Sequence, residues 1–135
     1  MASIVVGFID SPEGHAAMDS AIAEAELRSA KLVVVHSMVG GSHEDPEEYA
    51  LSSAAMESLH NRLHDLSVEH CTHEFVRGNS PAEDLTQAVA DHDASLVVIG
   101  IRRRSTTGKV LLGSNALEIL HDSPVPVLCV KAVEG

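Results

Sequence analysis

Short, continuous apolar segments recur along this chain, and longer segments with helix-start signals separate them. Four are rich in valine and isoleucine, at residues 3–9, 31–37, 95–101 and 125–130, and residues 69–76 form a weaker fifth. Their hydrophobicity is continuous rather than alternating, which is typical of strands that are covered on both faces. The pattern therefore predicts a sheet buried between two layers of helices.

Helix starts are well marked between these segments. Ser11 and Pro12 suit an N-cap and a first helical position, and Ser80 with Glu83 makes a capping-box pattern. Because strands and helices alternate, we expect an α/β protein with a parallel sheet and helices on both faces. The expected helices cover residues 12–29, 46–66, 81–92 and 114–122, and the second of them starts at Asp45-Pro46 with Glu48 in its first turn.

The excess of acidic residues over basic ones limits which kinds of partner the protein can bind. The 135 residues suit a single domain, residues 1–135, and the 44% of hydrophobic residues are enough for a core. The formal net charge of −11 argues against nucleic-acid or membrane-surface binding, because both require a basic face. With no Trp, one Tyr and two Phe, the chain also lacks an aromatic platform on which bases could stack.

Cysteine usage and the start of the chain bear on the compartment. Cys71 and Cys129 are too few for a disulfide framework and have no CxxC pattern, so we expect two buried thiols in a reducing compartment. The apolar stretch at residues 3–9 is too short for a signal peptide and lacks a basic start. No window reaches the length of a membrane span. We expect a soluble cytoplasmic protein.

A ligand site is expected at the carboxyl ends of the strands, where open α/β sheets bind their ligands. Asp10 follows the first apolar segment, and Gly100 ends the fourth. If these two strands are neighbours, both residues face one crevice. Asp10 is only an acceptor, which suits an exocyclic amine or a ribose hydroxyl.

The segment after Gly100 favours an anion. Gly113 and Ser114 open the last predicted helix, whose free N–H groups and partial positive charge suit a phosphate. Three arginines between strand and helix offer charge-assisted hydrogen bonds to phosphate oxygens. They are Arg102, Arg103 and Arg104.

Two common phosphate motifs are absent, and simpler interpretations of these residues stay open. Lys109 is followed by Val110, so no Walker loop is present, and the first strand is not followed by G-x-G-x-x-G. The arginines also suit a solvated loop. Gly113-Ser114 also suits a plain helix start, and Asp10 also suits a helix cap.

The nine histidines raise the possibility of a metal site. His60 and His64 lie four residues apart on a predicted helix, and His70, Cys71 and His73 lie within four residues. A third ligand cannot be assigned from the sequence, so we interpret these residues as ordinary surface histidines and expect no metal site. We also find no catalytic constellation, and expect a protein that is not an enzyme, with at most slow ATP hydrolysis.

The spacing Gly100-x2-Arg103-x9-Gly113-Ser114 resembles the G-x2-G-x9-G-[ST] nucleotide signature of the universal stress protein family. The resemblance covers essentially the whole chain and implies a Rossmann-like, five-stranded parallel sheet in the order 3-2-1-4-5. Four further stretches carry it: "IVVGFIDSPEGHAAMDSA", "LVVVHS" with His36, "RGNSPAEDL" and "SPVPVLCVK".

The resemblance also implies a ligand and an assembly. One branch of the family binds ATP or AMP between strands one and four, and we expect Mg²⁺ to accompany the nucleotide. Homodimers commonly pair their last strands, here at about Val125–Val130. By the resemblance, the adenine and ribose positions are Gly7, Phe8, Ile9, Asp10 and Ser37, and the phosphate positions are Gly100, Arg102, Arg103, Gly113, Ser114 and Asn115.

One position departs from the signature. Arg103 stands where the family has its second glycine, at a cost of about 1 kcal/mol or more if the position needs a positive φ. Its side chain either fills the phosphate site or clamps the phosphate. Because Gly100 and the Gly113-Ser114 end are kept, we expect a nucleotide-binding regulatory protein. The alternative is a nucleotide-free dimeric stress protein that acts through protein contacts alone.

Overall fold

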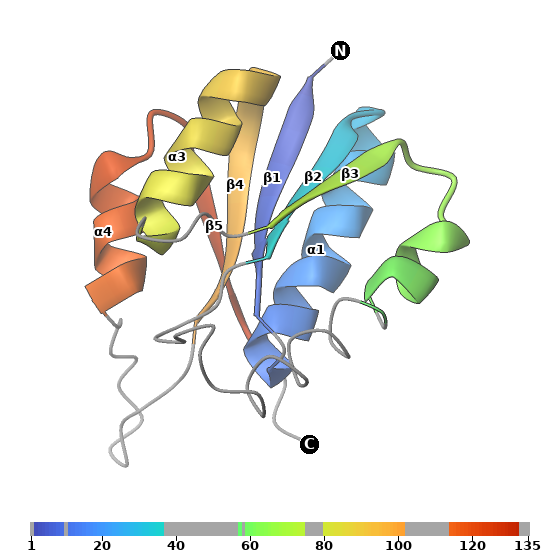
Figure 1. Ribbon diagram of the computed structural model, residues 1–135, viewed down its shortest axis with the longest axis horizontal. Helices are drawn as coiled ribbons and strands as arrows, with labels where there is room; N and C mark the ends of the chain where they lie inside the picture. Colours follow the sequence, from blue (N-terminus) through green and yellow to red (C-terminus); the bar gives the residue numbers. More distant parts are fainter. Residues whose placement is uncertain are drawn as a thin grey trace.

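The computed structural model describes residues 2–9, 11–36, 57, 59–74, 80–101 and 114–132. Strands and helices alternate along them around one central sheet (Figure 1). The predicted α/β class is therefore confirmed. The elements are β1 (Ser3–Phe8), α1 (Pro12–Arg28), β2 (Lys31–His36), β3 (His70–Glu74), α3 (Pro81–His92), β4 (Ala94–Ile101), α4 (Ser114–Asp122) and β5 (Val127–Lys131).

All five strands are parallel, and their order is β3-β2-β1-β4-β5. This order confirms the expectation from the family resemblance. The central strand β1 lies between β2 and β4, with Val5 paired to both Val33 and Val97. The carboxyl ends of β1 and β4 therefore lie side by side, which places the two strand ends that the sequence singled out at one crevice.

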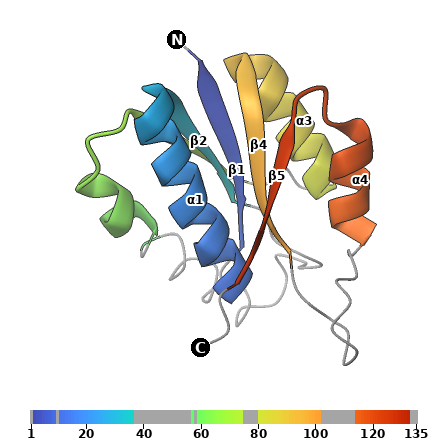
Figure 2. The ribbon, with the colours of Figure 1, turned by 180° about the vertical axis from the view of Figure 1, so that it is seen from behind.

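Helices cover both faces of the sheet, as predicted (Figures 1 and 2). On one face α1 packs against β1, β2 and β4 through small residues such as Ala17 and Ala21, together with a helical segment at residues 59–64. On the other face α3 and α4 pack over a second core that includes Leu85 and Ile119. Two apolar cores, separated by the sheet, fix the positions of the helix starts around the strand ends.

The predicted helix caps at Ser11 and Ser80 are confirmed. The Gly14 backbone N–H donates to Ser11 Oγ at 3.0 Å, and Ser80 with Glu83 forms a complete capping box at the start of α3. The cap predicted at Asp45 lies outside the described residues, and of the helix predicted over 46–66 the structure describes residues 57 and 59–64 as helical.

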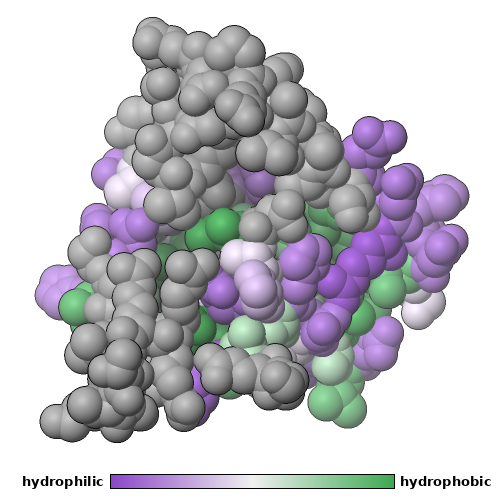
Figure 3. Space-filling model, turned by 90° about the horizontal axis from the view of Figure 1, so that it is seen from below, coloured by the Kyte–Doolittle hydropathy of each residue, from purple (hydrophilic) through white to green (hydrophobic). Residues whose placement is uncertain are grey.

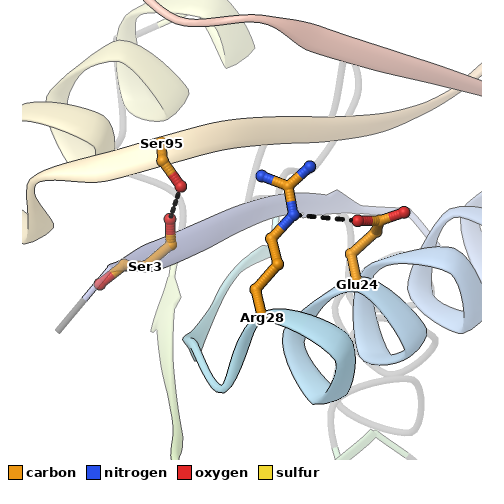
Figure 4. A network of polar contacts seen from close by, with 4 residues as sticks. All are labelled: Ser3, Glu24, Arg28 and Ser95. Carbon is orange, nitrogen blue, oxygen red and sulfur yellow. Dashed lines mark hydrogen bonds and ion pairs between the residues drawn. The ribbon is translucent and has the colours of Figure 1, made fainter.

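At the amino edge of the sheet the chain turns directly from helix into strand. Ser29 (φ 52°) ends α1 two residues before β2 begins, and Asp93 (φ 51°) is the single residue between α3 and β4. Left-handed residues of this kind are common helix C-caps. Polar contacts lie at the same edge, where Ser95 Oγ donates to the Ser3 carbonyl at 3.4 Å (Figure 4).

Two expectations from the sequence need correction. The last strand begins at Val127, not at Val125, because Pro126 cannot donate a ladder hydrogen bond and the Val125 N–H donates to Ser123 Oγ. The cysteines are only half-buried, since they lie on β3 and β5, the two edge strands of the sheet. Among the described helices, none is both long and apolar enough to cross a membrane.

Candidate ligand-binding site

A pocket of about 510 Å³, open to solvent, lies at the carboxyl edge of the sheet between β1 and β4. Figure 3 looks onto this edge, where hydrophobic and hydrophilic surface lie next to each other. The volume of this pocket includes space that is open to solvent. Its wall comes from the ends of β1 and β4 and from the first turns of α1, α3 and α4: Gly7, Ile9, Ser11, Glu13, Gly14, Pro81, Leu85, Ile99, Gly100, Asn115, Ala116 and Ile119.

The structure brings four of the predicted nucleotide residues to this pocket, namely Gly7, Ile9, Gly100 and Asn115. They come from β1, the residue after it, β4 and α4, which are distant in the sequence. Ser114 begins α4 beside Asn115. Five predicted positions lie outside the described residues: Asp10, Ser37, Arg102, Arg103 and Gly113.

Phe8 is placed differently from its neighbours. Its side chain is buried in the core on the α1 face, where its ring lies 5.2 Å from that of His15 and 6.1 Å from that of His36. Side chains alternate along a strand, so Gly7 and Ile9 point to the side opposite Phe8. A role for Phe8 toward a ligand is thus restricted to its backbone.

Sequence reasoning missed most of the apolar wall. Leu85 and Ile119 reach the pocket from α3 and α4, and no motif marks them. Ser11 and Gly14 could have been predicted to line the pocket, because the β1–α1 turn directly follows the carboxyl end of a strand. Gly14 has a structural role as well: a Cβ there would overlap the Ile9 carbonyl, so only glycine permits this tight turn from β1 into α1.

The three helix starts around the pocket differ in charge. The first turns of α1 and α3 carry acidic residues, Glu13 in α1 and Glu83 with Asp84 in α3, whereas α4 has none in its first turn. Each helix start has a partial positive charge, and acidic side chains offset it. Among these three, the start of α4 is therefore the one best suited to an anionic group of a ligand.

One polar contact joins α3 to α4 beside the pocket. Ser80 Oγ accepts from the Glu83 N–H at 3.1 Å and donates to Glu118 Oε1 of α4 at 3.3 Å. The cap of α3 is thereby tied to the helix that carries Asn115. This hydrogen bond adds to the apolar packing of α3 and α4 in the core on this face.

These features define a parallel α/β protein with a pocket at the reversal point of its strand order, where α/β proteins bind small molecules. The sequence profile of the Universal stress protein family matches residues 1–131. The chain belongs to the universal stress protein family.

Similar proteins support this membership. A universal stress protein of Mycolicibacterium smegmatis is 38% identical over 128 residues, which are 95% of this chain and 96% of the relative. The solved structure of a universal stress protein from Archaeoglobus fulgidus is 32% identical, with a TM-score of 0.77 over 97% of this chain and 99% of that one. A universal stress protein from the same organism, solved in complex with dAMP, is 28% identical, with a TM-score of 0.71 over 97% and 98%.

Proposed function

We propose that this protein is a cytoplasmic regulatory protein that binds ATP or AMP, with Mg²⁺, in the pocket between β1 and β4. It catalyses no reaction. The observation that carries the proposal is the convergence of Gly7, Ile9, Gly100 and Asn115 on one pocket.

The chemistry of the pocket suits the two parts of a nucleotide. Leu85, Ile99 and Ile119 provide an apolar wall for a flat base. The start of α4, which also lines the pocket at Asn115, offers N–H groups and a positive dipole end to phosphate, and its first turn has no acidic residue. The dAMP complex of the 28% identical relative supports an adenine nucleotide in particular.

We propose further that the protein forms a homodimer through β5. This strand is at the edge of the sheet and pairs only with β4 among the described strands. Leu128 on it is 37% exposed. An exposed apolar edge strand calls for a partner, and a second copy of the same strand is the simplest one.

Thermal unfolding with and without nucleotide tests the proposal. A ligand at one hundred times its Kd stabilises the folded state by about 2.7 kcal/mol. We expect millimolar ATP or AMP with Mg²⁺ to raise the unfolding temperature. No shift with either nucleotide would reject binding and leave the nucleotide-free dimer.

A pair of charge variants locates the phosphate. Asn115→Asp adds a negative charge within the pocket wall, at a helix start where aspartate does not harm folding. We expect it to weaken ATP binding about tenfold, which corresponds to about 1.4 kcal/mol. Leu117→Asp adds the same charge on the same turn, but Leu117 is 54% exposed and outside the pocket wall, so it should cost much less.

The variant Arg103→Gly distinguishes the two roles that the sequence leaves open for Arg103, clamping the phosphate or filling the phosphate site. If its side chain clamps the phosphate, Arg103→Gly weakens ATP binding because a charge-assisted hydrogen bond is lost. If Arg103 obstructs the site, the same variant binds ATP more tightly. Phosphate release from ATP by the purified protein, abolished by Gly113→Asp, would contradict the non-catalytic assignment.

A further inference from the structure

Three side chains with metal-binding atoms lie together away from the pocket. Cys71 and His73 are on the edge strand β3, and His92 is the last residue of α3. Cys71 Sγ lies 3.8 Å from His73 Nε2, which lies 2.8 Å from His92 Nε2. All three atoms are within 4.8 Å of one another.

The fold explains why these residues meet. Cys71 and His73 are two positions apart on a strand and so point to the same face. Cys71 packs against the core under α3, which identifies that face as the α3 side. Helix α3 runs back across it and ends at His92, so a residue nineteen positions from His73 completes the group.

We propose that Cys71, His73 and His92 bind one divalent transition-metal ion of the zinc type. One thiolate and two imidazoles are the ligands that Zn²⁺ prefers, and its catalytic and exchangeable sites often have three protein ligands. His73 is exposed, so water has access to a fourth coordination position.

Two of the three distances between ligand atoms need only small adjustment, and Cys71 Sγ and His92 Nε2, which lie within 4.8 Å, must come to about 3.6 Å. Zn–N bonds of about 2.0–2.1 Å and a Zn–S bond of about 2.3 Å, at tetrahedral angles, put the two nitrogens about 3.3 Å apart and sulfur about 3.6 Å from nitrogen. The His73–His92 pair must open by about 0.5 Å, and Cys71 must approach His73 by about 0.2 Å. Side-chain torsions of an exposed histidine allow such shifts.

Protonation of the three groups is compatible with this role. Each imidazole binds through the Nε2 lone pair and keeps its proton on Nδ1, while the Cys71 thiol releases one proton to solvent as the sulfur–metal bond forms. Burial, His73 and Lys31 lower the pKa of His92, against an opposing effect of Asp91.

The surroundings also bear on a cation. The carbonyl groups at the C-terminus of α3 are a partial negative charge beside His92, and Asp91 and Asp93 flank it in the sequence. Lys31 acts against them. With a formal net charge of −11, the chain as a whole attracts cations.

Cobalt titration of the full-length protein tests the proposal. The reduced protein is freed of metal with a chelator and titrated with Co²⁺, whose bond to thiolate gives a charge-transfer band in the near ultraviolet and whose tetrahedral sites absorb strongly in the visible. We expect both signals to saturate at one Co²⁺ per chain. Zn²⁺ should displace the cobalt and abolish them.

Matched variants decide which residues bind. Cys71→Ser should abolish the charge-transfer band, and His92→Gln should weaken Co²⁺ binding by more than the roughly 10–100-fold typical of losing an outer-shell partner. Cys129→Ser and His64→Gln, which change the other cysteine and an exposed helical histidine, should leave the titration unchanged. Circular dichroism checks that each variant is folded.

Two results would overturn the proposal. One is a wild-type titration without the thiolate band. The other is Co²⁺ binding that survives Cys71→Ser at full affinity, which would indicate unrelated surface histidines. The proposed metal ligands are distant from the pocket. Pro81 in the pocket wall and His92 are eleven residues apart on α3, or about 16 Å. A variant that loses metal binding should therefore keep its nucleotide binding, so the two proposals can fail independently.

Discussion

Gly100 lies directly against the backbone of Glu13. A Cβ on Gly100 would overlap the Glu13 carbonyl group and lie 3.1 Å from the Glu13 Cβ. The end of β4 and the first turn of α1 are therefore in contact at this point, and both line the pocket. The absence of a side chain at residue 100 lets these two pocket walls meet.

Gly100→Ala should therefore destabilise the protein. The added methyl group has to push α1 away from β4, and overpacking of this kind costs about 1–3 kcal/mol. Gly7→Ala is the control, because its Cβ would lie 3.4 Å from the Leu85 methyl groups, an ordinary contact. Urea unfolding should show the difference, and equal midpoints for the two variants would contradict the close contact at Gly100.

Ser80→Ala should destabilise α3. It removes the hydroxyl group that caps the helix and also contacts Glu118, and loss of an N-cap costs about 1 kcal/mol. Glu118→Ala removes only the contact between exposed side chains and should cost about half that or less. The free energy of unfolding in urea measures both, and a larger cost for Glu118→Ala would mean that the α3–α4 contact outweighs the cap.

Cys129 should make stability depend on pH in the alkaline range. Burial raises the pKa of its thiol, so in the unfolded chain the thiol ionises at a lower pH than in the folded one. Its contribution is fully present below the unfolded pKa and is lost as the pH rises through the folded pKa. Urea unfolding at several pH values should show a smaller alkaline loss for Cys129→Ala, and identical profiles would exclude this effect.

Leu128→Glu should dissociate the proposed β5 dimer. The substitution places a charge on the exposed edge strand, where two copies would bring like charges together. Sedimentation equilibrium should then report a monomer. Leu27→Glu makes the same change on α1, at a residue that is 81% exposed, and should stay a dimer.

The fold could be predicted from the helix caps and the apolar strand segments because all of these local signals favour the same parallel α/β arrangement. The caps at Ser11 and Ser80 begin helices where expected, and continuous apolar strands form a sheet covered on both sides. The last strand was misplaced at its start, where Pro126 interrupts an otherwise apolar run. The hydrophobicity of residues 125–130 is typical of a strand, but Pro126 has no backbone N–H with which to join the sheet.

The sites were less accessible to sequence reasoning. Strand ends and glycines identified one side of the pocket, whereas Leu85 and Ile119 enter it through helix packing that has no motif. His73 and Cys71 are recognisable as neighbours in the sequence, but His92 is not, because it joins them only where the C-terminus of α3 comes near β3. Contacts of this kind depend on the tertiary arrangement rather than on spacing.

The connections at the amino and carboxyl ends of the strands differ in how far their length can change. At the amino edge, Asp93 alone joins α3 to β4, and one inserted residue would shift the strand register and turn each β4 side chain to the opposite face. At the carboxyl edge, residues 102–113 separate β4 from α4. A change in chain length after β4 leaves the register of that strand unchanged, so the chain should tolerate an insertion better after β4 than at Asp93.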